Sequence, residues 1–366
     1  MSSSGWCLSA KPVLHETMTR SFLTENQFVE WLRLKALKTG HGVKVGIGDD
    51  AAVLSFRQGH DVLLKSDMTI EGVHFSADLH PPRAVGHRAL ARSLSDIAAM
   101  GGTPKFALVS LAMSRDATRA WVGSFYAGLL ALARRFAVTV VGGDTAVVPE
   151  ATMVDLIVAG QVKQGRALLR SGARPGDVIC VSGCPGSSAL GLQILSGREI
   201  SRGKPPARVS SRDGLQARAI RAHLYPEPRL ALGRYLLDRR LASAAMDISD
   251  GIAIDLGRLS EASGVGAIIW QDHLPKPTAA ELRNMDWLSL ALRGGEDYEL
   301  LFTVPRHKVP MVATTFQGTP VTHIGEITKS KGLRVVRLNG REQELEPAGY
   351  DHFRKKVESQ TSKSEK

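Results

Sequence analysis

A regular alternation of short apolar runs with longer stretches of helical periodicity constrains the fold of this chain more than any other feature. The predicted strands of the first half are residues 62–67, 106–113, 138–144 and 154–162, and the predicted helices are residues 24–38, 82–100 and 115–136. Strands separated by helices of this length indicate an α/β or α+β layered fold and argue against an all-β sandwich.

A segment rich in Gly, Arg and Pro, GRALLRSGARPGD at 165–177, separates this series from a second one. The second series has predicted strands at 178–183, 244–250, 267–270, 298–304, 321–327 and 333–338, and predicted helices near 187–196 and 228–240. We therefore expect an N-terminal domain at 21–165 and a C-terminal domain at 166–354, with a loose extension at 1–20 and a flexible basic tail at 355–366.

The formal net charge of +11 leaves three explanations open: nucleic acid, an anionic small substrate, or no specific partner. Much of this charge lies in residues 201–223 and 353–366, which lack the interleaved aromatic residues that stack on single-stranded nucleic acid. A solvated loop and a frayed tail explain both segments, so nucleic acid is not an expected partner.

The sequence has no apolar run of the length that a membrane span needs, and its first residues lack the apolar core of a signal peptide. Its three cysteines are too few for a disulfide framework and are expected to be free thiols. We expect a cytoplasmic protein without a membrane partner.

Acidic residues recur at the ends of predicted strands. They are Asp49 and Asp50 after VGIG, Asp67 after VLLKS, Asp144 after VTVVGG, and Asp247 and Asp250 in AAMDISD. Ligand sites of layered α/β folds collect at the carboxyl ends of strands. Carboxylates that converge there repel one another unless a cation is present, and Mg²⁺ with its preference for oxygen ligands meets that need.

Glycines accompany the acids, because GIG at 46–48 and GGDT at 142–145 place bare backbone amides beside carboxylates. Such amides can approach phosphate oxygens closely, so the pattern predicts a polyphosphate bridged by Mg²⁺. Neither a Rossmann G-x-G-x-x-G nor a Walker P-loop is present. Any ATP site would therefore follow another plan.

Each acidic residue also has an ordinary structural explanation. Asp49 and Asp50 could form an exposed turn, Asp250 could cap the helix that begins at GIAIDLGRL, and Asp96 could lie on a solvated helix face. The metal hypothesis gains weight only because several segments share the pattern.

Eight blocks in order give the chain a family resemblance that covers about residues 22–353. They are GIGDDAAV (46–53), KSDMTIEGVHF (65–75), SLSDIAAMGGTP (93–104), VVGGDT (140–145), GRALLRSGARPGD (165–177), DISDGIAIDLGRL (247–259), LRGGEDYELLFTV (292–304) and GYDHF (349–353). The chain resembles thiamine-monophosphate kinase, a family similar in fold to aminoimidazole ribonucleotide synthetase.

The resemblance implies a two-domain fold, in which the N-terminal sheet pairs with that of a second subunit to form a dimer barrel and an α/β C-terminal domain folds over it. It implies transfer of the γ-phosphoryl group of ATP onto thiamine monophosphate, giving thiamine diphosphate and ADP. A homodimer, several Mg²⁺ ions and ATP as co-substrate are the partners and cofactors that follow.

The resemblance also assigns site residues by matching position. Mg²⁺ ions would be held by Asp50, Ser66, Asp67, Asp96, Asp144, Asp247 and Asp250. ATP would contact Gly143, Asp144, Arg170 and Ser249, and thiamine monophosphate would contact His74 and Glu296. The acceptor phosphate is already ionised at neutral pH, so no general base is assigned.

Two positions depart from the family pattern. Lys65 stands where many relatives have Ser or Thr, and an ammonium cannot ligate Mg²⁺, so either one metal contact is lost or the Lys65 carbonyl supplies it. Pro347 stands in the substrate site where relatives often have a tryptophan over the thiamine rings. Glu296 could instead brace the next strand, and His74 could be a core histidine.

A second hypothesis is an ATP-dependent synthetase of the same superfamily that acts on another anionic metabolite. GGEDYEL at 294–300 is kinase-like, and no Cys stands near the glycine-rich loop, unlike in selenophosphate synthetases.

Overall fold

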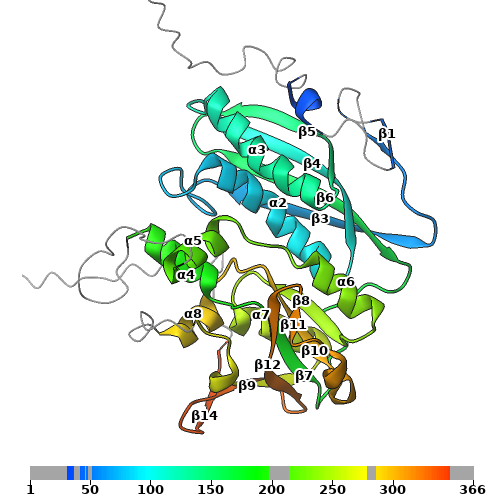
Figure 1. The fold of residues 1–366 in the computed structure, drawn as a ribbon, viewed down its shortest axis with the longest axis vertical. Helices are drawn as coiled ribbons and strands as arrows, with labels where there is room; N and C mark the ends of the chain where they lie inside the picture. Colours follow the sequence, from blue (N-terminus) through cyan, green and yellow to red (C-terminus); the bar gives the residue numbers. More distant parts are fainter. Residues whose placement is uncertain are drawn as a thin grey trace, which may run out of the picture.

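The computed structural model describes residues 31–36, 42–45, 47, 52–197, 214–277 and 286–346. Figure 1 shows two large sheets, each with its own helices, and β1 and β2 pair as a separate short sheet. The elements are β1 (Val43–Val45), β2 (Val53–Leu54), β3 (His60–Ile70), α2 (Pro82–Ala99), β4 (Thr103–Ser114), α3 (Arg119–Arg135), β5 (Thr139–Val148), β6 (Met153–Lys163), β7 (Val178–Ser182), α4 (Ser187–Leu195), α5 (Leu215–Leu224), α6 (Leu230–Asp238), β8 (Ala244–Ile248), α7 (Ile252–Ser263), β9 (Gly266–Trp270), η1 (Gln271–His273), α8 (Trp287–Arg293), β10 (Glu299–Val304), η3 (Arg306–Met311), β11 (Thr315–Phe316), β12 (Thr319–Thr328), β13 (Gly332–Val336) and β14 (Glu342–Glu344).

The N-terminal sheet has four strands in the order β3-β6-β4-β5, so β3 and β5 form its two edges. Only the β4–β5 pair is parallel; β3–β6 and β4–β6 are antiparallel. Side chains alternate across a strand, and on β3 Leu63 and Thr69 are buried on the helix side. Leu64 and Met68 instead lie exposed on the open face.

Helix α2 is almost entirely buried and joins the two halves of the molecule (Figure 1). Gly86 permits its close approach to α3, because a Cβ there would lie 2.0 Å from the carbonyl oxygen of Phe125. Gly233 of α6 does the same on its other side, where a Cβ would lie 1.9 Å from the carbonyl oxygen of Ala98. Helix α2 therefore contacts the N-terminal α3 and the C-terminal α6 at backbone distance.

The C-terminal sheet follows the order β14-β13-β9-β12-β7-β10-β8, with β11 paired to β12. The β13–β9 pair is parallel, while β8, β10 and β7 pair antiparallel. Every residue of β8 and β10 is buried. This sheet has its own core, which includes Ile248, Leu256 and Leu301.

The structure confirms the mixed helix and sheet fold and the predicted strands and helices of residues 62–196. Of the helix predicted at 24–38, residues 31–35 are helical, Ala36 forms a bend, and the remaining residues lie outside the described ranges. The solvated loop predicted at 201–223 is wrong at its end, because α5 buries Ala219 and His223. No helix within the described ranges is long and apolar enough to cross a membrane.

Candidate active site

Lys65, Asp67 and Asp96 form an acidic cluster that contains one ammonium group. Lys65 and Asp67 project from the helix side of β3, and Asp96 comes from α2. Lys65 Nζ lies 3.0 Å from Asp96 Oδ2 and 3.5 Å from Asp67 Oδ1. Burial raises the pKa of Asp67. The positive charges of Lys65 and Arg92 lower it, but by less than burial raises it. Asp67 on the strand and Asp96 on the helix, both predicted to lie in one site, therefore lie on either side of the same ammonium group.

Asp247 supplies the third carboxylate of this cluster from the C-terminal sheet. Its side chain is only 4% exposed. Burial raises its pKa to about 8, and the negative charges of Asp96 and Asp255 add to the effect. A cation bound next to this buried carboxyl group would stabilise its ionised form, so the position is suited to binding a cation.

Helix α2 carries a row of charged side chains between the cluster and the C-terminal half. Arg88, Arg92 and Asp96 are four residues apart and so lie on one helical face. Arg92 Nη2 is 4.0 Å from Asp67 Oδ1. The Nη1 atom of Arg92 is buried and has no hydrogen-bond partner among the described residues. The row changes from acidic to basic with distance from the cluster.

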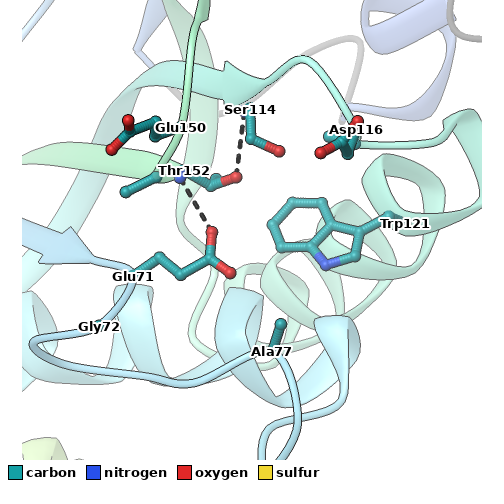
Figure 2. Close-up of a pocket in the computed structure, with 10 residues that line it drawn as sticks. Glu71, Gly72, Ala77, Ser114, Asp116, Trp121, Glu150 and Thr152 are labelled. Atoms are coloured by element: carbon teal, nitrogen blue, oxygen red, sulfur yellow. Dashed lines mark hydrogen bonds between the residues drawn. The ribbon is translucent and has the colours of Figure 1, made fainter.

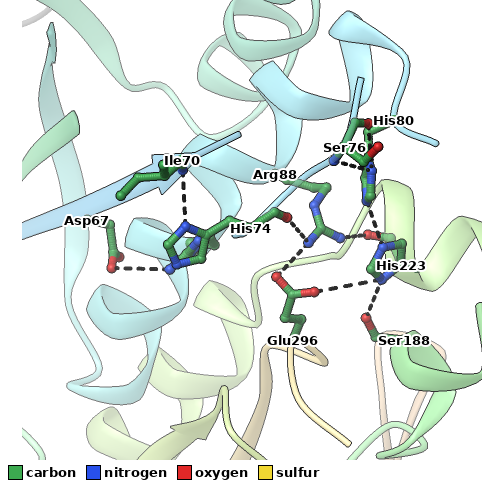
Figure 3. Close-up of polar contacts among 10 residues, drawn as sticks. Asp67, Ile70, His74, Ser76, His80, Arg88, Ser188, His223 and Glu296 are labelled. Atoms are coloured by element: carbon green, nitrogen blue, oxygen red, sulfur yellow. Dashed lines mark hydrogen bonds and ion pairs between the residues drawn. The ribbon is translucent and has the colours of Figure 1, made fainter. Parts of the chain in front are cut away.

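Glu296 lies at the basic end of this row, in the loop between α8 and β10 (Figure 3). Its Oε1 accepts a hydrogen bond from Arg88 Nη2 at 2.6 Å. Burial alone would raise its pKa, but Arg88, His223 and Arg92 outweigh burial and lower it. The backbone N–H of Glu296 donates to the carbonyl oxygen of Ser249 at 2.7 Å. Glu296 is thus an ionised carboxylate beside Ser249.

Two histidines complete the network around Arg88 (Figure 3). The Nε2 atoms of His80 and His223 are 2.9 Å apart, and His223 Nδ1 lies 3.0 Å from Ser188 Oγ. Burial, followed by the charge of Arg88, lowers the pKa of His223 to about 3. Both histidines are therefore neutral at physiological pH, and Arg88 supplies the cation that balances Glu296.

Asp255 shapes the turn that carries Ser249 and Asp250. Its Oδ2 accepts the backbone N–H groups of Ser249 at 2.9 Å and Asp250 at 3.0 Å. Arg258 Nη1 bonds both Asp250 Oδ2 at 2.6 Å and Asp255 Oδ1 at 3.0 Å. Burial raises the pKa of Asp255 to about 6. The turn is therefore held by a buried carboxylate on α7.

Gly143 and Asp144 lie on β5, at the opposite edge of the N-terminal sheet from Asp67. The strand register runs in one row from Asp67 through Leu156 and Val109 to Gly143. Three strand spacings separate the ends of this row by about 14 Å. Gly143 has φ +152°, and a Cβ there would lie 1.9 Å from the carbonyl oxygen of Val109, so only glycine fits.

The family of AIR synthase related proteins matches this chain in two parts, its N-terminal domain over residues 48–162 and its C-terminal domain over residues 174–337. The thiamine-monophosphate kinase of Escherichia coli strain K12 is 40% identical over 85% of this chain and 92% of its own length. That of Bacillus subtilis is 36% identical over 85% of this chain and 94% of its own length. The chain belongs to the thiamine-monophosphate kinase family.

A solved structure of the same kinase family, AaThiL complexed with AMPPCP and TMP, superposes with a TM-score of 0.69. It is 32% identical, and the match covers 90% of this chain and 97% of that one. The match extends over both sheets, so this chain and that kinase share the whole two-part fold.

Not every residue expected from the kinase family reaches the cluster. Ser66 points to the other face of β3, where its Oγ donates to Asp155 Oδ1 at 2.8 Å. Arg170 is exposed, and its carbonyl oxygen accepts from Ser263 Oγ at 3.1 Å. His74 Nδ1 accepts the N–H of Ile70 at 3.0 Å. Asp49, Asp50 and Pro347 lie outside the described residues.

Four residues that contact the predicted site residues escaped prediction: Arg88, Arg92, His223 and Asp255. The spacing of Arg88 and Arg92 to Asp96 was a usable signal, because it places all three on one helical face. His223 lies 135 residues from its partner Arg88, so no local pattern could have joined them.

The donor atoms of the cluster fit the Mg²⁺ that the kinase family implies. Within the described ranges, no group of three or more His, Cys, Asp or Glu side chains is already arranged to hold a metal ion. Asp67, Asp96 and Asp247 nevertheless offer the hard oxygen atoms that Mg²⁺ prefers. Burial and the charges of Asp96 and Asp255 raise the pKa of Asp247, and Lys65 opposes this only in part.

A separate cavity of about 470 Å³ lies beside α3, away from the cluster (Figure 2). Trp121 faces it together with Glu71, Asp116 and Glu150. None of the residues expected to bind ATP, substrate or metal lines this cavity.

Proposed function

We propose that this chain transfers the γ-phosphoryl group of ATP onto thiamine monophosphate, giving thiamine diphosphate and ADP. Its curated relatives are named thiamine-monophosphate kinase, and AaThiL was solved with AMPPCP and TMP. One contact carries the proposal in this chain. The hydrogen bond from Glu296 N to Ser249 O joins the residue assigned to the acceptor with one assigned to the nucleotide.

ATP is assigned to Gly143, Asp144, Arg170 and Ser249, and thiamine monophosphate to His74, Glu296 and Pro347. The ionised carboxylate of Glu296 suits a substrate that carries a thiazolium cation and an aminopyrimidine donor. Arg88 holds that carboxylate in place, because its guanidinium is buried and bonds Glu296 directly. Residues that hold Glu296 therefore set the orientation of the acceptor.

Mg²⁺ is assigned to Asp67, Asp96 and Asp247, together with Asp50, Ser66, Asp144 and Asp250. When bound, Mg²⁺ neutralises charge on the transferring phosphoryl oxygens. The protein's own contribution is position and positive charge: Arg92 lies between the cluster and Glu296, with Nη1 buried and unbonded among the described residues. No side chain is assigned as general base, because the acceptor phosphate is already ionised.

A homodimer would complete this site. Asp67 and Gly143 lie at opposite edges of the four-stranded sheet, so one chain does not bring Asp144 beside Asp67. A second copy that pairs its β5 edge with β3 would do so and would close the two sheets into one barrel. The exposed apolar side chains Val62, Leu64, Met68 and Ile157 on the open face support such burial.

We also propose the domain limits 21–165 and 166–354, with residues 1–20 as an extension and residues 355–366 as a tail. The division lies between β6 and β7, where the chain leaves one sheet and enters the other. The cytoplasmic location stays a prediction.

The deciding experiment measures ADP and thiamine diphosphate formed from ATP and thiamine monophosphate, with and without Mg²⁺. Asp67→Asn should lower turnover by at least about 100-fold, because a metal ligand stabilises the transferring charge. Asp238→Asn makes the same chemical change at an exposed position of α6 and should leave turnover unchanged. ATP binding without thiamine diphosphate would favour a synthetase with another anionic acceptor.

A further inference from the structure

Lys65 brings a positive charge of the chain itself into the acidic cluster. Side chains alternate along β3, so Lys65 and Asp67 share the face that looks toward α2, whereas Ser66 looks away and bonds Asp155. The Lys65 ammonium lies 3.0 Å from a carboxylate oxygen of Asp96 and 3.5 Å from one of Asp67. It therefore bridges a strand and a helix.

This contact differs from an ordinary surface ion pair. The side chains of Lys65, Asp67 and Asp96 are 31%, 16% and 25% exposed, so all three are largely withdrawn from water. Asp247 acts on the same ammonium electrostatically. Two carboxylates, one from β3 and one from α2, thus contact one lysine, and charges in such a setting are screened less than on the surface.

We propose that the Lys65 ammonium is a permanent cation of this site and takes the place of one divalent ion between Asp67 and Asp96. An ammonium has three N–H donors and no lone pair, so it neutralises carboxylates without acting as a ligand. It also needs no recruitment from solution. The inference rests on the proposed function, because a metal–nucleotide reaction is what gives the cluster its role.

A simple alternative is that the backbone carbonyl of Lys65 contacts a metal ion while the side chain only lies nearby. The two possibilities differ in what happens when the ammonium is removed. If the ammonium replaces a divalent ion, its removal opens a place for that ion. If only the carbonyl matters, the number of bound ions does not change, because every substitution keeps the carbonyl.

The test counts Mn²⁺ ions bound per chain by electron paramagnetic resonance, with a non-hydrolysable ATP analogue present. Lys65→Ser should bind about one more Mn²⁺ ion per chain than wild type, because the freed carboxylates regain oxygen-ligand geometry. Lys163→Ser removes the same charge from an exposed position on the neighbouring strand β6 and should leave the count unchanged. Equal counts in wild type and Lys65→Ser overturn the proposal.

A second measurement covers a variant that folds poorly. Lys65→Met keeps the apolar stem of the side chain, and its melting temperature in EDTA should fall below that of wild type and rise more on addition of Mn²⁺. An equal Mn²⁺ response of the two proteins contradicts the proposal. Neither readout needs turnover, so a wild type that makes no thiamine diphosphate would refute the kinase and leave the ion count to decide the role of Lys65.

Discussion

Arg88 Nη2 lies 2.6 Å from Glu296 Oε1, and this ion pair joins residues 208 positions apart. Arg88 is 2% exposed and also donates to the carbonyl oxygens of His223 and His74. The position of Glu296 therefore depends on a buried cation from the N-terminal half, although Glu296 itself belongs to the C-terminal half.

Arg88→Met should weaken substrate binding and stability together. Glu296 would lose the partner that holds it, so we expect the KM for thiamine monophosphate to rise about 10-fold. The free energy of unfolding should fall by about 3 kcal/mol, since a largely buried charge would be left unpaired. Steady-state kinetics and urea denaturation measure the two effects.

The surface pair of Arg135 and Glu227 offers a matched control for Arg88→Met. Arg135 is also paired with a glutamate but is 58% exposed. Arg135→Met should cost no more than about 1 kcal/mol and leave KM unchanged. Similar effects of the two substitutions would contradict a special role for Arg88.

Asp247→Asn should stabilise the metal-free protein at pH 7. The pKa of Asp247 is raised from 3.8 to about 8, so folding requires this carboxyl to keep its proton, at a cost that grows as the pH rises through that range. Asparagine removes a cost of roughly 2–4 kcal/mol. Denaturation in EDTA should show the gain, and saturating Mg²⁺ with nucleotide should reverse the order. A less stable asparagine variant in EDTA would disprove this account.

His223 should make the protein less stable as the pH falls below 6.5. Its pKa drops from 6.5 to about 3 on folding, so the unfolded chain binds the proton more tightly and gains stability in acid. Between pH 7.5 and 5.5 this residue alone should cost about 1.4 kcal/mol. His223→Gln should lose less stability over that interval than wild type in urea denaturation. Parallel declines would mean that other groups control the acid response.

Leu64→Lys should prevent dimer formation. Leu64 is 73% exposed on the open face of the N-terminal sheet, where the proposed barrel would bury it and a lysine would be desolvated. Size-exclusion chromatography with light scattering should find a monomer. Leu338→Lys alters a leucine that is 71% exposed in the C-terminal half and should leave the dimer intact. A wild-type monomer would refute the dimer itself.

The sequence was informative where the signal was local. The sequence indicated that Asp67 and Asp247 would lie near other carboxylates, because each stands near the end of an apolar strand, and in the structure both lie close enough to Asp96 to feel its charge. Helix α5 was missed because its arginines resemble a solvated loop, while its buried side, with Ala219 and His223, depends on contacts made elsewhere in the fold.

Strand order was the part that no local pattern could supply. Asp67 and Asp144 occur in similar strand-end motifs, yet β3 and β5 occupy opposite edges of one sheet. Which strand becomes an edge depends on long-range pairing, in this case the insertion of β6 between β3 and β4. Two similar strand-end motifs therefore place Asp67 and Asp144 at opposite edges of the N-terminal sheet.

The charged row on α2 also fixes the distance between its two ends. Arg88 and Asp96 are eight residues apart, so the helical rise fixes about 12 Å between the residue that bonds Glu296 and the residue that pairs with Lys65. Under the proposed function, this one helix sets the separation between the phosphoryl donor and its acceptor. Insertion of a single residue between Arg88 and Asp96 would rotate Asp96 by about 100° relative to Arg88, so the two side chains would no longer lie on one face of the helix.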